Sequence, residues 1–69
     1  MSALLTNEEK SGIINQHIKN LDYSIFNTEM SLIEEKAVKE SENADSLQSQ
    51  LEILNLKRDA LLAELSKVS

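Results

Sequence analysis

Residues 40–46 read Glu-Ser-Glu-Asn-Ala-Asp-Ser, a polar stretch that separates two long segments of heptad spacing. It contains no large apolar side chain, and Ser41, Asn43 and Asp45 are residue types that cap the start of a helix. The stretch therefore predicts a turn, over about 40–45, that reverses the chain. Because the 69 residues hold no proline and only one glycine, the alternative is one unbroken helix of about 60 residues, near 90 Å long at about 1.5 Å per residue.

After this turn, apolar residues recur at alternating steps of three and four, which is the spacing of a coiled-coil seam. The pattern predicts a second helix over about 45–67. Its seam contains Leu47, Leu51, Leu54, Leu61 and Leu65, with Arg58 as the charged member. A second stripe of the same spacing lies on the far side of this helix and consists of Ile53, Leu56, Ala60 and Ala63.

The segment before the turn has the same two-sided pattern and predicts a first helix over about 6–39. Its seam contains Ile14, Ile18, Leu21, Ile25 and Leu32, with Thr28 as a polar interruption. A second stripe, Phe26, Met30, Ile33 and Ala37, lies roughly 130° around the helix from the seam.

The start of the first helix carries its own signal. Thr6 and Glu9 have the spacing of a capping box, in which each side chain binds the backbone N–H of the other residue. Gly12 follows within the first turns. We interpret this glycine either as a frayed or bent first turn or as a place of close contact with another helix.

These patterns together predict an all-α fold, a coiled-coil-like antiparallel hairpin in which residues 1–69 form a single domain and residues 54–65 lie beside 19–30. An antiparallel hairpin buries one stripe per helix, and soluble monomers rarely expose large contiguous apolar patches. We therefore expect the second stripes to form an interface, either with other copies, which assembles the hairpin into a four-helix or larger bundle, or with a helix of another protein. The alternative is that they are scattered surface residues on an imperfect hairpin.

Polar residues in the seam raise the question of register. An unpaired buried guanidinium is costly, so Arg58 is expected to reach solvent or to pair with Asp22 or Glu29 across the seam. A polar residue in a seam often sets register and partner number. Arg58 and, more weakly, Thr28 are therefore candidate register-setting residues.

Charge gathers at the predicted turn. Six acidic residues and two lysines lie between residues 29 and 45, out of a net charge of −5 for the chain. We define the acidic tip as Glu34, Glu35, Glu40, Glu42 and Asp45. The tip either keeps the hairpin ends soluble and apart or docks on a basic surface and speeds the encounter.

Composition excludes many functions. The absence of cysteine removes disulfide scaffolds, cysteine-based zinc sites and thiol catalysis. His17 has no metal-ligand partner at helical spacing, and no phosphate loop or catalytic set occurs, so we expect no metal, no cofactor, no small-molecule substrate and no enzymatic activity.

The sequence also argues against binding to nucleic acid, because the net charge is negative, only two residues are aromatic and the basic residues are scattered. No stretch approaches 18 apolar residues, so no membrane partner is expected, and the default location is the cytoplasm or an assembled particle.

Three stretches of the N-terminal half, residues 5–10, 15–23 and 31–35, read Leu-Thr-Asn-Glu-Glu-Lys, Asn-Gln-His-Ile-Lys-Asn-Leu-Asp-Tyr and Ser-Leu-Ile-Glu-Glu. This half of the chain resembles small uncharacterised helical proteins encoded by marine and cyanobacterial phages. The resemblance implies a viral setting, in the host cytoplasm or in the virion, where short helical proteins serve as virion parts, assembly factors or antagonists of host proteins.

Two functions follow as hypotheses. In the first, the chain is a non-enzymatic helical hairpin that associates with itself, as a dimer to tetramer, and acts as a structural or assembly module. In the second, it is a small acidic regulatory protein that binds or inhibits a host or partner protein.

Overall fold

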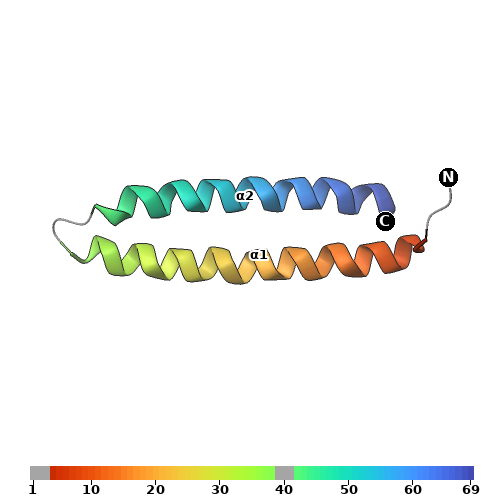
Figure 1. The fold of residues 1–69 in the computed structure, drawn as a ribbon, viewed down its shortest axis with the longest axis horizontal. Helices are drawn as coiled ribbons and strands as arrows, with labels where there is room; N and C mark the ends of the chain where they lie inside the picture. The colour runs from red at the N-terminus through yellow and green to blue at the C-terminus, as the bar shows by residue number, and fades with distance from the viewer. Residues whose placement is uncertain (1–3, 39–41) are drawn as a thin grey trace.

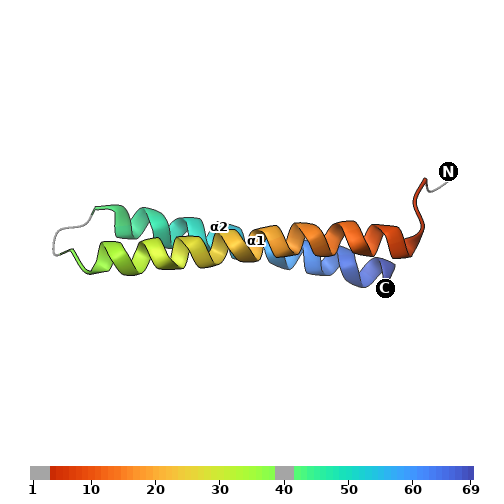
Figure 2. The same ribbon diagram turned by 90° about the horizontal axis from the view of Figure 1, so that it is seen from below.

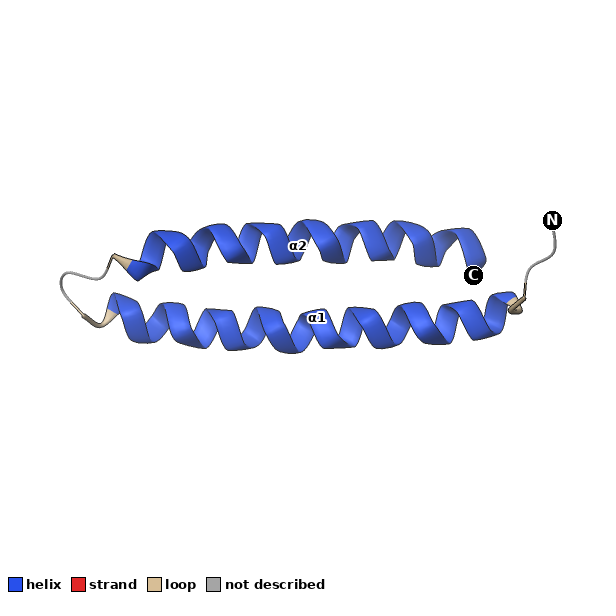
Figure 3. Ribbon diagram, viewed as in Figure 1, coloured by secondary structure: helices blue, strands red, loops and turns tan. Residues whose placement is uncertain are grey.

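The structure, a computed structural model, describes residues 4–38 and 42–69. Over these residues the chain forms two long helices, α1 (Asn7–Lys36) and α2 (Asn43–Val68), that pack side by side and antiparallel (Figure 1). Figure 3 shows that helix accounts for nearly all of the described chain. The predicted all-α hairpin is confirmed, and the alternative of one continuous helix is wrong.

The hairpin is a rod and not a globule. It measures 55 × 15 × 15 Å, and its radius of gyration is 16.2 Å, whereas a compact domain of this length would have about 11 Å. Seen from below, the two helices cross at a shallow angle near their middles (Figure 2). Within the described residues the two helices meet along one seam, and this seam is the core of the hairpin.

The start of α1 is held by the predicted capping box, which the structure confirms. The Thr6 backbone N–H donates to Glu9 Oε1 at 2.9 Å, and the Glu9 N–H donates to Thr6 Oγ1 at 3.1 Å. Gly12 lies inside the regular helix, and a Cβ added to it would meet nothing within 4 Å. Neither a bend nor a close contact within the hairpin therefore accounts for this glycine.

The ends of the helices at the turn differ from the expectation. α1 ends at Lys36 and not near 39, with Ala37 as its C-cap, and α2 begins at Asn43 and not at 45. The N-cap of α2 is Glu42, whose backbone is already α-helical and whose side chain makes no capping hydrogen bond. Asn43 and Asp45 are thus inside the helix, while Glu40, Ser41 and the middle of the predicted turn lie outside the described residues.

Asn43 does not cap α2, because its side chain is used across the turn. Asn43 Nδ2 donates a 2.6 Å hydrogen bond to Glu35 Oε1 at the end of α1. Further along the rod, Asp22 lies level with Arg58. These two contacts set residues 54–65 opposite about 15–26, one helical turn from the expected 19–30.

Candidate interaction surfaces

The seam holds the side chains that are most withdrawn from solvent. Ile18, Leu32 and Leu51 are the buried hydrophobic residues of the described chain, with 7%, 8% and 9% exposure. The other seam residues are half-buried: Ile14, Leu21, Ile25, Thr28, Leu47, Leu54, Arg58, Leu61 and Leu65. Since no described residue is fully buried, the hairpin hides its seam only in part.

Arg58 pairs with Asp22, one of the two carboxylates that the sequence offers. Arg58 Nε donates to Asp22 Oδ1 at 2.6 Å, and the two side chains remain 35% and 48% exposed. The hydrogen bond to Asp22, followed by its negative charge, raises the pKa of Arg58. The guanidinium group therefore lies at the edge of the seam, where it is paired with the Asp22 carboxylate and remains accessible to water.

Thr28, the second candidate register residue, satisfies its hydroxyl group within its own helix. Thr28 Oγ1 donates to the Ser24 carbonyl at 2.8 Å. A hydroxyl that bonds its own backbone carries no information on which residue lies opposite. Of the two candidates, Arg58 is therefore the one with a polar contact to the other helix.

The outward side of α1 carries a continuous apolar surface, which we call the α1 outer face. It comprises Tyr23 (63% exposed), Phe26 (59%), Met30 (37%) and Ile33 (61%), and it ends at the exposed Ala37. Phe26, Met30, Ile33 and Ala37 belong to the stripe that the heptad pattern indicates. Tyr23 extends this stripe by one step of three, so the residue spacing alone is sufficient to place it on the face.

The α2 outer face is smaller. It comprises Ile53 (52% exposed), Leu56 (68%) and the exposed residues Ala60 and Ala63. Two of its four members are alanines, so it presents less apolar area than the α1 outer face and a flatter profile.

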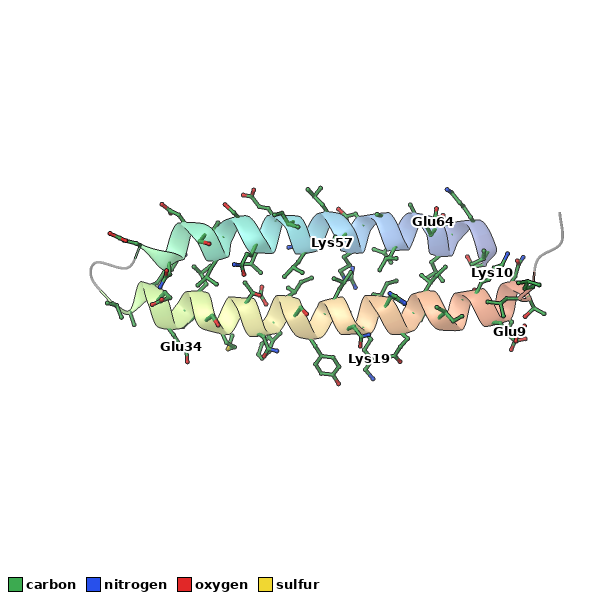
Figure 4. The ribbon with its side chains drawn as sticks, in the orientation of Figure 1. Glu9, Lys10, Lys19, Glu34, Lys57 and Glu64 are labelled. Atoms are coloured by element: carbon green, nitrogen blue, oxygen red, sulfur yellow. The ribbon has the colours of Figure 1, made fainter. Side chains whose placement is uncertain are left out.

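The two outer faces point to opposite sides of the hairpin. Each lies roughly 140–160° around its own helix from the seam, at 100° per residue, and the two seams face one another. Figure 4 shows Lys19 and Glu34, which border the α1 outer face, projecting from the side of α1 that is turned away from α2. A single flat partner therefore cannot cover both outer faces at once.

A shallow groove of about 470 Å³ runs between the helices on one side of the seam. Leu21, Leu61 and Ala60 supply its apolar lining, and His17 and Glu64 are among its polar lining residues. It is a furrow between two side-by-side helices and meets the edge of the α2 outer face at Ala60.

The acidic tip is only partly a solvated surface. Glu34, Glu42 and Asp45 are exposed as expected, and Glu40 lies outside the described residues. Glu35 differs, because it is half-buried and accepts the hydrogen bond from Asn43. The sequence signal was available: Glu35 falls seven residues after Thr28 and so continues the seam.

In residues 4–38 and 42–69, no cluster of histidine and acidic side chains could hold a metal ion. Neither α1 nor α2 has the length and hydropathy needed to span a bilayer.

The chain matches no protein-family model, no curated protein and no solved structure. Its class is defined by its own fold and surface: an antiparallel α-helical hairpin that exposes an apolar face on the outer side of each helix.

Proposed function

We propose that the chain is a non-enzymatic helical hairpin that associates with itself and serves as a structural or assembly module, in the viral setting that the resemblance of its N-terminal half implies. One observation carries this proposal: eleven large hydrophobic residues of the described chain are exposed, whereas three are buried. A two-helix rod with so little core is marginal on its own.

The magnitude of the exposed surface favours association. Phe26, Met30, Ile33, Ile53 and Leu56 keep between 37% and 68% of their surface exposed, and together they present some 500 Å² of apolar area. At roughly 25 cal/mol per Å², covering this area contributes on the order of 12 kcal/mol before the entropy of association is subtracted. That is enough to decide the state of a chain of this size.

The first experiment measures the mass of the purified chain by light scattering over a range of concentrations. We expect a dimer to tetramer at micromolar concentration. A helical chain that remains monomeric at every concentration would contradict self-association and favour the second hypothesis, an acidic regulatory protein that binds a different partner.

The second experiment places a charge on each outer face. We expect the double substitution Met30→Asp and Ile53→Asp to dissociate the assembly, because each carboxylate would have to be desolvated in the interface. The matched control, Ser24→Asp with Gln50→Asp, adds the same charge at exposed polar positions outside the outer faces. An unchanged mass in the first variant, with the control also unchanged, would rule out the outer faces as the interface.

A further inference from the structure

We propose that the α1 outer face pairs with the same face of a second copy of this chain, antiparallel, about a two-fold axis that passes beside residue 28. This inference rests on the self-association proposed above and names the face and the register that produce it.

The apolar residues match one another in this register. An axis at residue 28 sets Phe26 opposite Met30 of the second copy and Tyr23 opposite Ile33 of the second copy, each pair occurring twice. Beyond these pairs, the aliphatic stem of Lys19 covers Ala37 of the second copy, with its ammonium group free to reach solvent. All the large exposed residues of the face, between 37% and 63% exposed in the hairpin, are thus covered.

The charges at the border of the face favour the antiparallel arrangement. On the border of the face that holds Asp22, Glu29 and Lys36, Asp22 faces Lys36 of the second copy, again twice, and the like-charge approach is Glu29 to its own copy beside the axis. A parallel pairing in equal register would instead set Glu29 beside Glu34 of the second copy on both borders. Because opposed like charges are unfavourable, electrostatics selects the antiparallel pair.

The α2 outer face of a second copy would cover the α1 outer face less well than a second α1 outer face does. Aligning its large residues with those of α1 sets Ile53 opposite Ile33, but then Ala60 and Ala63 stand opposite Phe26 and Tyr23. Two alanines bury less of these rings than Met30 and Ile33 do. The same alignment brings Asp59 beside Glu29.

The area is adequate for a dimer. The four large residues of the α1 outer face expose roughly 500 Å² in each copy, so pairing buries on the order of 1,000 Å² in total, about the minimum for a specific interface. The α2 outer face has only two large residues, Ile53 and Leu56, and falls short of this area by about half. The α1 face is thus the one that can support a dimer by itself.

The experiment uses single cysteines, because the natural chain has none. Asn20, Asn27 and Glu34 are exposed residues that border the α1 outer face, and Lys57 is an exposed residue that borders the α2 outer face. Each is changed to cysteine separately, the full-length variants are oxidised alone or as mixtures, and the products are separated on non-reducing gels. Circular dichroism verifies that each variant keeps its helicity.

The proposed axis predicts a specific pattern of links. Asn27→Cys alone should shift to twice its mass, because residue 27 faces its own copy. Asn20→Cys alone and Glu34→Cys alone should not shift, but their mixture should, because residue 20 faces residue 34 of the second copy. Lys57→Cys should form no link with itself or with Asn27→Cys.

Each other pattern overturns the inference in a recognisable way. Asn20→Cys linking with itself would indicate an antiparallel pair about a different axis, and Asn27→Cys linking with Lys57→Cys would indicate an open-ended contact of α1 on α2. An oligomer of the natural chain with no links at all would indicate a parallel pair or an interface elsewhere. If the natural chain is monomeric in light scattering, the self-association proposal itself fails, which is distinct from these outcomes.

Discussion

The seam and the outer faces are built from similar residues but have different physical roles. Both use leucine and isoleucine at steps of three and four, and the outer faces add alanine, methionine and aromatic residues. Leu51, in the seam, is 9% exposed. Leu56, five residues later on the same helix but on the α2 outer face, is 68% exposed. The comparison teaches that the local pattern specifies where apolar side chains gather, whereas burial depends on which element packs against them.

The largest expected effect separates the two surfaces directly. Leu51→Ala should lower the free energy of unfolding by about 2–3 kcal/mol, because it removes buried methyl groups from the only core of the hairpin. Leu56→Ala should change it by less than about 0.5 kcal/mol. Both are measured by urea denaturation in the dissociated Met30→Asp, Ile53→Asp background, so that assembly does not contribute. Equal losses at the two positions would show that the outer face of α2 is covered within a single chain.

A smaller effect is expected where a charge interrupts the seam. Arg58→Leu should raise the denaturation midpoint, because an exposed ion pair stabilises little and a leucine continues the apolar seam. The same variant should broaden the distribution of oligomer masses if Arg58 sets register through Asp22. The control Asp22→Asn keeps the shape of the partner and removes its charge. A marked destabilisation by Arg58→Leu would instead show that the pair is essential to the hairpin.

Gly12 offers a test outside both surfaces. Gly12→Ala should raise the free energy of unfolding by about 0.5–1 kcal/mol, because alanine loses less backbone entropy in a helix and its Cβ meets no neighbour. In the proposed dimer, the second copy of α1 does not reach this residue, so the mass in light scattering should stay the same. A loss of assembly would show that the glycine provides close contact between helices of different chains.

The smallest effect concerns pH at the start of α1. The hydrogen bond from the Thr6 backbone N–H, with a further contribution from the Thr6 side chain, lowers the pKa of Glu9, because it favours the charged carboxylate. Such a group stabilises the folded chain above its unfolded pKa, and this contribution is lost as the pH falls through the lower, folded pKa. We expect the protection of the amides of residues 7–10 against exchange, relative to the intrinsic rate at each pH, to fall below about pH 4, and Glu9→Gln to remove this pH dependence. Residues 43–46, which start α2 without a side-chain cap, are the internal control.

Much of the fold could be predicted from short-range features. The capping box at Thr6 and the two heptad seams depend only on spacing along the chain, and they define two helices. The register and the turn could not be predicted as closely. They depend on the pairs Asp22–Arg58 and Glu35–Asn43, which join residues far apart in sequence. For the candidate site, the heptad pattern predicts both stripes, whereas the exposure of Tyr23 beside its stripe and the inward position of Glu35 depend on how the two helices pack.

The sequence by itself determined that this protein is helical, that each helix has two apolar sides and that a polar segment divides them, because helix formation and amphipathic spacing are local properties. Only the tertiary structure decided which of the two sides is buried and that the remaining faces point in opposite directions. The physical reason is that a helix can turn either apolar side toward a neighbour of suitable shape. The choice is made by the area buried and the charges matched across the whole length of the pair.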